Sequence, residues 1–517
     1  MKMEVCMVQF IKRPGRFPIG GFVLFLIIGS LTCSSPDTEI SDEELRSYVE
    51  FLASDELEGR MVGTSGCTRA EQYIAGEFKD IGLKPLPGEE DFFIDFTLYR
   101  RGYEEEKTSL EIRIGDERIE AHPGIDFRPF PFSSSGIKKA NLVFAGYGIS
   151  APEYDYDDYK GLEVTDKFVL VLRHEPAEGP TEDYFEGSAY TDHSLFTKKA
   201  ENAYLHGAAG MLLTTDPASG RGAEDLRLTE TYSLSPYGFG PYSQEKPILA
   251  AHISQDFAAK IIEQTGFSLD EIQKALDSGL KPTELILKDA VVELQIERLK
   301  EAIPLSAHNL GGIIEGNHPQ LKNEWILLGA HHDHIGSFTG EGDTIYNGAD
   351  DNASGVSGIL ALARSLSGER ASLQRSVVFI TFGAEEVGLL GSRALVNMQF
   401  IPQRVKYMIN LDMIGRNPDK PVQVITEGNA VDLRGIVESA NEQSGLKLRF
   451  SNSKRSSDSD HYTFGKLGIP FLFFFTGVHE DYHGTEDHAE KLYYYRMKRI
   501  LDLVREVILL LGSGLEF

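Results

Sequence analysis

Acidic and histidine residues that could hold metal ions recur along the second half of the chain. They are His331-His332-Asp333, Asp350-Asp351-Asn352, Glu385-Glu386, Asp412 and His483. Hydrophobic runs typical of strands precede most of them: Trp325–Ala330, Val377–Phe382, Met408–Leu411 and Ile469–Phe475. Because the carboxyl ends of parallel strands meet at one edge of an open α/β sheet, we expect these side chains to gather there. Histidines and carboxylates suit zinc, and the surplus of carboxylates indicates a paired-metal site with a base beside it.

The spacing of His331 and Asp333 indicates how the first cluster works. Residues two apart on an extended segment project to the same side, so both side chains face one site. His331 can then bind a metal while Asp333 accepts the proton on the other ring nitrogen. His332 would point to the opposite side of the strand. A hydrogen-bonded core histidine is the alternative interpretation of any one of these residues.

The remaining acidic clusters differ in how strongly they indicate a functional site. A helix N-cap explains one acid of Gly348–Gly355, a glycine-flanked turn that opens a helix. Adjacent residues at a strand end diverge, so of Glu385 and Glu386 one can bind metal while the other acts as a base. Asp412 follows an apolar strand, where a buried carboxylate needs a partner such as a metal.

A competing zinc motif, HExxH, is formed by residues His479 to His483. Its chemistry needs both histidines one helical turn apart. Gly477 precedes and Gly484 follows the motif, directly after a strand-like run, which favours a loop. We therefore expect His483 alone to bind metal.

The elements that must position these residues alternate between strands and helices. Helices are expected from Ser41 to about Ala53 and over 68–81, 356–366, 431–444 and 490–511. The pattern predicts an α/β fold with a mostly parallel central sheet flanked by helices in three layers. Between 138 and 287 the texture changes to short strands and polar loops, which predicts an inserted β-rich domain. The catalytic domain would then comprise 37–137 and 288–517.

Composition and the N-terminus limit the partners and the location. The chain has 517 residues and a formal net charge of -28, which argues against nucleic acid as a partner. Basic residues precede the apolar stretch Phe17–Leu31. We expect 1–32 to be a lipoprotein-type signal, with Cys33 acylated in an exported, periplasmic or outer-membrane-anchored protein. The membrane would be contacted only through that lipid, and ordinary secretion or an uncleaved anchor are the alternatives.

Together these motifs resemble the di-zinc aminopeptidase family of clan MH, metallopeptidase family twenty-eight. The inserted domain is similar to a protease-associated domain by position and texture. The segments that carry the resemblance are LASDELEGRMVGTSG (52–66), LLGAHHDHIG (327–336), NGADDNASG (347–355), TFGAEEVGLLGS (381–392), INLDMIGR (409–416), SDHYTFG (459–465) and DYHGTEDH (481–488).

The resemblance implies a set of metal ligands. His331 and Asp412 would bind one Zn²⁺, Glu386 and His483 the second, and Asp350 would bridge both. Two zinc ions per chain are expected, although cobalt or manganese could occupy the same ligands. The family pattern also implies a cis peptide bond between the bridging Asp350 and Asp351.

The resemblance further implies catalytic roles. Glu385 would be the general base that deprotonates the attacking water, and Asp333 the partner of the metal ligand His331. Tyr482 is the candidate for hydrogen-bonding the developing oxyanion. Asp460 and His461 are expected to line the pocket.

The expected reaction is removal of N-terminal residues from peptides with a free N-terminus. A carboxypeptidase of the same clan would need basic residues that grip a carboxylate, and the insertion offers Arg221 and Arg227. A glutaminyl-cyclase-like transferase uses a single zinc, and a non-catalytic binding ectodomain would have lost ligands. The apparently complete ligand set disfavours both.

Overall fold

The structure is a computed structural model that describes most of the chain after the N-terminal segment. It describes residues 39–130, 132–176, 185, 190–217, 231–235, 248–279, 282, 287, 289–337, 342–398, 400–427, 432–451 and 458–514. The expected signal segment with Cys33, and the insertion arginines Arg221 and Arg227, lie outside these residues. Within the described ranges, no helix is both long enough and apolar enough to cross a membrane.

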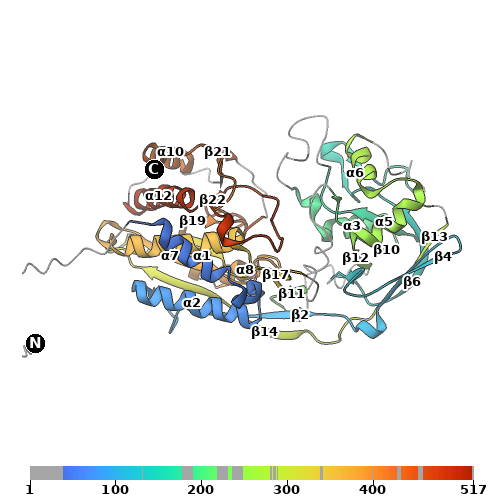
Figure 1. The fold of residues 1–517 in the computed structure, drawn as a ribbon, viewed down its shortest axis with the longest axis horizontal. Coiled ribbons are helices and arrows are strands. Elements are labelled where there is room, and N and C mark those ends of the chain that lie inside the picture. The colour runs from blue at the N-terminus through green and yellow to red at the C-terminus, as the bar shows by residue number, and fades with distance from the viewer. Residues whose placement is uncertain are drawn as a thin grey trace, which may run out of the picture. The chain divides into compact units, whose positions relative to one another are not determined.

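A ten-stranded mixed sheet forms the centre of the region that contains the candidate metal ligands (Figure 1). Its order is β11-β2-β14-β18-β15-β19-β22-β20-β21, and β1 pairs with β14. The four central strands β18, β15, β19 and β22 run parallel. The strands are β1 (Lys84–Pro85), β2 (Phe93–Arg101), β11 (Thr231–Ser233), β14 (Ile303–Ile314), β15 (Trp325–His331), β18 (Ser376–Phe382), β19 (Val405–Leu411), β20 (Val422–Glu427), β21 (Leu448–Ser451) and β22 (Phe471–Phe475).

The central strands are buried on both faces, which explains why they are continuous hydrophobic runs rather than alternating ones. In β15, Ile326 and Leu328 pack into a core on one face. Trp325 and Leu327 point into a second core on the other face. The sheet therefore lies between two helical layers, as expected from the sequence.

Two sets of helices cover these faces (Figure 1). Helices α1 (Asp42–Leu52), α2 (Ser65–Ile81), α7 (Gly355–Ser367), α10 (Leu433–Ser444) and α12 (Tyr494–Gly512) contribute to the first core. Helices α8 (Leu390–Asn397), α9 (Phe400–Arg404) and α11 (His461–Gly465) contribute to the second. The Ser41 side chain caps α1 by accepting from the Glu44 amide, and Gly82 ends α2 with φ 81°.

The second sheet has eight strands in the order β4-β3-β13-β6-β9-β10-β12-β5. Its strands are β3 (Ser109–Ile114), β4 (Glu117–Ala121), β5 (Phe127–Pro129), β6 (Gly136–Phe144), β9 (Phe168–Leu172), β10 (Gly210–Thr214), β12 (Leu249–Ile253) and β13 (Ala290–Ile296). Small pairs are β7 (Ser150–Ala151) with β8 (Tyr156–Asp157), and β16 (Gly336–Ser337) with β17 (Ile345–Tyr346).

This sheet corrects the expected boundaries of the insertion. Strands β3, β4 and β5 precede residue 138 and β13 follows residue 287, yet all four belong to the second sheet. The region is also less purely β than its texture indicated, because it contains α3 (Phe196–Leu205), α5 (Gln255–Ile262) and α6 (Leu269–Asp277). Sequence texture missed the hairpin β3–β4 because its pairing with β13 spans the whole insertion.

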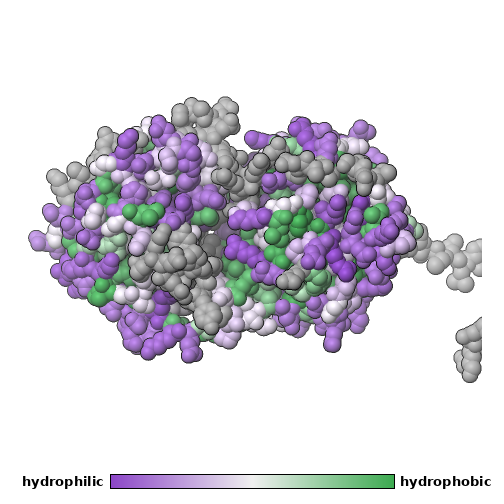
Figure 2. All heavy atoms as spheres, turned by 180° about the vertical axis from the view of Figure 1, so that it is seen from behind, coloured by the Kyte–Doolittle hydropathy of each residue, from purple (hydrophilic) through white to green (hydrophobic). Residues whose placement is uncertain are grey.

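The surface carries both hydrophilic and hydrophobic side chains. On the face drawn in Figure 2, hydrophilic side chains surround and interrupt the hydrophobic ones. Large apolar side chains that are exposed come from separate elements, as Ile125, Leu205 and Leu467 do. Scattered apolar residues of this kind need no binding partner to explain them.

Removing a core side chain between α7 and α12 should destabilise the catalytic region. Leu501 is fully buried, and its Cδ2 lies 2.8 Å from where a Cβ on Gly358 would stand. Leu501→Ala should lower the free energy of unfolding by about 3 kcal/mol, because it leaves a cavity. Leu467→Ala, at a position 53% exposed, is the matched control and should change it by less than about 0.5 kcal/mol. Urea titration measures both, and equal losses would contradict this packing.

Candidate metal centre

The ends of neighbouring parallel strands bring the acidic and histidine residues together. His331 is the last residue of β15, and Asp412 directly follows β19. Glu385 and Glu386 come shortly after β18, and His483 lies in the turns after β22. Because these strands are adjacent and parallel, their carboxyl ends share one edge of the sheet.

Asp351 stands at the centre of this cluster. Its Oδ1 lies 3.2 Å from His331 Nε2, and its Oδ2 lies 3.1 Å from His483 Nε2. The residue lies in the turn Ala349–Ser354 that precedes α7, and its own backbone is not helical, with φ -107° and ψ 94°. Each oxygen of the Asp351 carboxylate thus faces a different histidine, and only 5% of the Asp351 side chain is exposed.

This geometry corrects the expectation that Asp350 bridges. Asp350 points away, where its Oδ1 accepts from the Gly415 amide at 2.6 Å and its Oδ2 lies 3.3 Å from His479 Nε2. The cis peptide bond is accordingly Asp351–Asn352 rather than Asp350–Asp351. The two adjacent aspartates project to different sides of the turn. Their order in the sequence does not tell which of them faces the strand ends.

Each histidine beside Asp351 has a second carboxylate of its own. His331 Nε2 lies 3.5 Å from Asp412 Oδ1, and His483 Nε2 lies 3.3 Å from Glu386 Oε2. Glu385 Oε2 is farther from His331 Nε2, at 3.9 Å. The cluster therefore has two halves that share Asp351, and Glu385 lies beside the first half.

The Asp333 carboxylate was expected to contact the His331 ring, but it contacts the backbone of the glutamate pair instead. Its two oxygens accept from the backbone amides of Glu385, at 3.0 Å, and Glu386, at 3.3 Å. The ring nitrogen His331 Nδ1 contacts the Asp333 main-chain carbonyl at 3.1 Å, whereas the carboxylate is 4.0 Å away. Asp333 thus orients His331 through its backbone and the glutamate pair through its side chain.

Sequence reasoning missed two residues that hold the Asp351 turn. The Asp487 carboxylate is fully buried and accepts from the amides of Asp350, at 2.9 Å, and Asp351, at 3.1 Å. Arg60 is 1% exposed and donates to the carbonyls of Leu52, His332, Asn347 and Gly348. Both residues lie inside motifs that carry the family resemblance, which is the signal that could have singled them out.

Of the other histidines nearby, His334 contacts a residue of the cluster and His479 does not. His334 Nδ1 lies 2.8 Å from Glu386 Oε1, so it holds the oxygen that does not face His483. His479 contacts Asp350 and is not part of the cluster. The segment 479–483 forms turns and no helix, as expected, so HExxH is not a zinc-binding helix here.

Three further residues named from the sequence lie close by. The Tyr482 ring stacks on His483, with ring centroids 3.9 Å apart. Asp460 and His461 are both fully buried, and the His461 ring stacks on Phe473 at 4.3 Å. Burial raises the pKa of Asp460 to about 7, although the His331 charge opposes this effect.

The charges at the centre affect one another strongly. Burial favours the neutral form of Asp351, but its hydrogen bonds with His331 and His483 outweigh burial and lower its pKa well below the usual value. Burial raises the pKa of Glu385 well above the usual value, opposed by His331 and reinforced by Glu386. Asp351 is therefore an anion held between two cationic or metal-binding partners, and Glu385 is poised to carry a proton.

The donor set fits zinc. Tetrahedral zinc with bonds of 2.0–2.1 Å separates neighbouring N and O donors by about 3.3 Å. The four separations around Asp351, His331, Asp412, Glu386 and His483 run from 3.1 to 3.5 Å. Side chains that merely form ion pairs also reach such distances. The convergence of the other four residues around the Asp351 carboxylate is what indicates a metal site.

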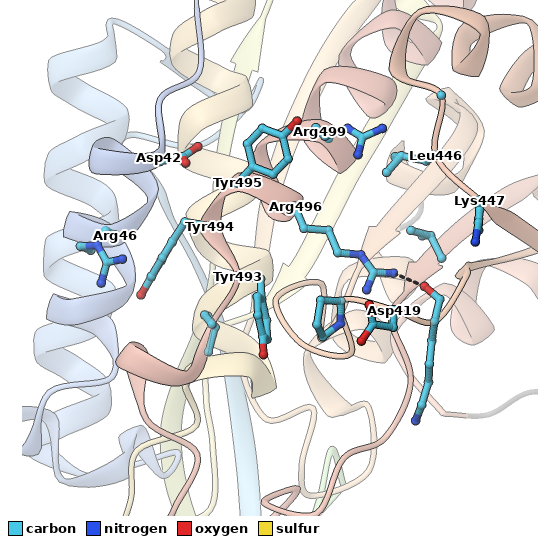
Figure 3. A pocket seen from close by; sticks show the side chains of 15 residues that line it. Asp42, Arg46, Asp419, Leu446, Lys447, Tyr493, Tyr494, Tyr495, Arg496 and Arg499 are labelled. Atoms are coloured by element: carbon cyan, nitrogen blue, oxygen red, sulfur yellow. Dashed lines mark hydrogen bonds between the residues drawn. The ribbon is translucent and has the colours of Figure 1, made fainter.

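A pocket away from this cluster has a different character (Figure 3). Lining residues from α1, α12 and nearby loops include Arg46, Lys447, Arg496 and Arg499. Arg496 donates to the Lys420 carbonyl at 2.6 Å, and Arg499 donates to the Ser444 carbonyl. Arg496 and Arg499 thus bind main-chain carbonyls, and the residues lining the pocket include none of the clustered metal-ligand candidates.

Comparison with known proteins agrees with the geometry. Residues 309–508 match the model of peptidase family M28, and this range contains every residue of the cluster. The chain is 28% identical over 225 residues to aminopeptidase YwaD of Bacillus subtilis (strain 168). That match covers 41% of this chain and 46% of YwaD, so it spans about half the length of this relative.

Solved structures share the fold over nearly the whole chain. An aminopeptidase from Aneurinibacillus sp. strain AM-1 superposes with a TM-score of 0.57 at 22% identity, covering 92% of this chain and 94% of its own. BSAP, a zinc aminopeptidase from Bacillus subtilis, gives a TM-score of 0.55 at 21% identity, covering 93% and 98%. The match to peptidase family M28 over residues 309–508 includes every residue of the cluster.

Proposed function

We propose that this protein is a zinc-dependent aminopeptidase that removes residues from the free N-terminus of peptides. The main support for this proposal is the Asp351 carboxylate, whose two oxygens face His331 and His483. The match to the peptidase family M28 model and the aminopeptidases among the relatives support the same reaction class.

Two ions would be held by the two halves of the cluster. His331, Asp412 and Asp351 would bind one, and Glu386, His483 and Asp351 the other. Bound zinc supplies Lewis acidity that polarises a carbonyl and makes water nucleophilic near neutral pH. The shared Asp351 means that the two ions would be bound close together.

Glu385 is the proposed general base. Its backbone amide is fixed by Asp333, and its side chain is 11% exposed beside His331. From this position Glu385 takes a proton from the attacking water and passes it to the leaving amine. Burial raises the pKa of Glu385 above its usual value, which makes its carboxylate a stronger proton acceptor.

The substrate would approach from the partly exposed side of the cluster. The side chains of Glu385, Glu386 and His483 are more exposed than those of His331 and Asp351. Carboxylates on that side attract the ammonium group of a peptide N-terminus, which favours aminopeptidase action. Tyr482, stacked on His483, is proposed to hydrogen-bond the oxyanion that forms from the carbonyl.

The location and the insertion also belong to this proposal. The signal-like segment 1–32 and Cys33 support export and a lipid anchor. The position of the second sheet, which interrupts the catalytic region between β2 and β14, supports a protease-associated-like domain.

Separate replacement of Asp351 and Asp350 by asparagine tests which of them binds metal. Asp351→Asn should lose bound zinc, because the two halves of the cluster share this carboxylate. Asp350→Asn should keep wild-type zinc content, since an amide oxygen can still accept from Gly415. Elemental analysis of zinc-reconstituted, dialysed protein gives both stoichiometries. Zinc loss in Asp350→Asn alone would reverse the assignment.

Removal of the proposed base should separate chemistry from metal binding. Glu385→Gln should lower kcat at least ~10²-fold, the usual contribution of a general base, while zinc content stays unchanged. Glu386→Gln is the matched control and should lose zinc together with activity. A Glu385→Gln enzyme with near wild-type kcat contradicts the proposed role.

Blocked and free substrates test the specificity. Zinc-reconstituted protein should hydrolyse aminoacyl-nitroanilides with a free amine and leave their N-acetylated counterparts intact, because the carboxylates recognise the ammonium group. Release of nitroaniline measures both. Equal cleavage of the two sets would point to a peptidase that does not recognise the N-terminus, and cleavage of neither would count against the aminopeptidase itself.

A further inference from the structure

A second group of metal-ligand side chains lies on the opposite side of β15 from the centre. His332 follows His331 and, as expected for adjacent residues of an extended segment, points the other way. Its ring is 1% exposed, and its Nδ1 lies 3.1 Å from Thr381 Oγ1. Its Nε2 is buried and makes no hydrogen bond among the described residues. The nearest acidic atom is Glu71 Oε1, at 3.6 Å.

Helix α2 presents two further ligands to this nitrogen. Cys67 and Glu71 are separated by one helical turn, so they share a face of the helix, and both are buried. Cys67 Sγ lies 3.8 Å from Glu71 Oε1. Helix α2 packs against β14 (Figure 1), from which His308 Nδ1 reaches Glu71 Oε2 at 3.0 Å. His308 thus orients the carboxylate and leaves Oε1 facing Cys67 and His332.

These three ligand atoms have the spacing of donors around one ion. They all lie within 4.8 Å of one another. Around tetrahedral zinc, with a Zn–S bond of ~2.3 Å and Zn–O and Zn–N bonds of ~2.0 Å, sulfur and oxygen are about 3.5 Å apart and nitrogen and oxygen about 3.3 Å. The observed 3.8 and 3.6 Å exceed these separations by only a few tenths of an ångström.

The neighbouring backbone leaves room beside His332. A Cβ on Gly383 would lie 3.3 Å from His332 Nε2 and 2.5 Å from the His308 carbonyl oxygen. The glycine therefore keeps a side chain out of the space next to the nitrogen that lacks a hydrogen bond. A buried imidazole nitrogen, a thiol and a carboxylate converge here, and in the described part of the chain the imidazole nitrogen has no hydrogen-bond partner.

We propose that Cys67, Glu71 and His332 bind a zinc-class ion distinct from the cluster around Asp351. The thiol ligand selects a soft or borderline metal such as zinc over magnesium or calcium. Three protein ligands leave one tetrahedral position for water. The ion would join α2 to the end of β15, and so would brace the backbone that carries His331 from behind. This proposal does not depend on the peptidase activity.

Sulfur coordination provides a direct test in the full-length chain. The Cys6→Ser/Cys33→Ser variant keeps Cys67 as its only thiol and serves as the parent. After zinc loading and dialysis, X-ray absorption at the zinc edge should show a sulfur neighbour at about 2.3 Å. Adding Cys67→Ser should remove that sulfur signal and lower the zinc content by one ion per chain. The nitroanilidase activity does not enter this readout.

Cobalt offers a second measurement on the same proteins. The cobalt-loaded parent should show a thiolate-to-cobalt charge-transfer band that the Cys67→Ser protein lacks. A parent with its Asp351 cluster loaded but no sulfur neighbour and no such band would overturn the proposal. Retention of the sulfur signal without Cys67 would overturn it as well. If Cys67→Ser does not fold, the parent spectra decide alone, because they contain a single thiol.

Discussion

The burial of one shared carboxylate is the constraint on which the structure of the centre depends. Asp351 is an anion with little access to water, and such a group is stable only when every oxygen has a partner. Histidines on either side supply those partners at 3.2 and 3.1 Å. Because these histidines come from segments far apart in the sequence, the turn of Asp351 must be held in one position relative to the strand ends.

The surrounding hydrogen bonds provide that restraint. Asp487 accepts from two successive amides of the turn, and Arg60 joins the carbonyls of His332, Asn347 and Gly348. Arg60 therefore connects the loop after β15 to the loop that carries Asp351. The carboxylate of Asp333 similarly fixes the glutamate pair after β18. The proposed base and metal ligands are thus positioned by backbone contacts, which leave their side chains available for chemistry.

Adjacent residues of one extended segment point to opposite sides, and this connects the cluster around Asp351 with the proposed site at Cys67, Glu71 and His332. His331 faces the centre and His332 faces α2, so one stretch of backbone would be braced from both sides. The first turn of α2 belongs to the LASDELEGRMVGTSG block, and Arg60 lies in the same block. This N-terminal segment supports the active edge of the sheet although it supplies none of the proposed catalytic groups.

The sequence by itself determined the fold class and most of the candidate residues of the centre, because both follow from local pattern. Hydrophobic runs of strand length identified β15, β18, β19 and β22, and polar residues after them identified His331, Glu385, Glu386, Asp412 and His483. Only the tertiary structure decided that Asp351 rather than Asp350 is central, since that depends on how one turn projects its side chains. It also decided the extent of the second sheet and the roles of Arg60 and Asp487. These depend on contacts between distant segments, which local periodicity does not encode.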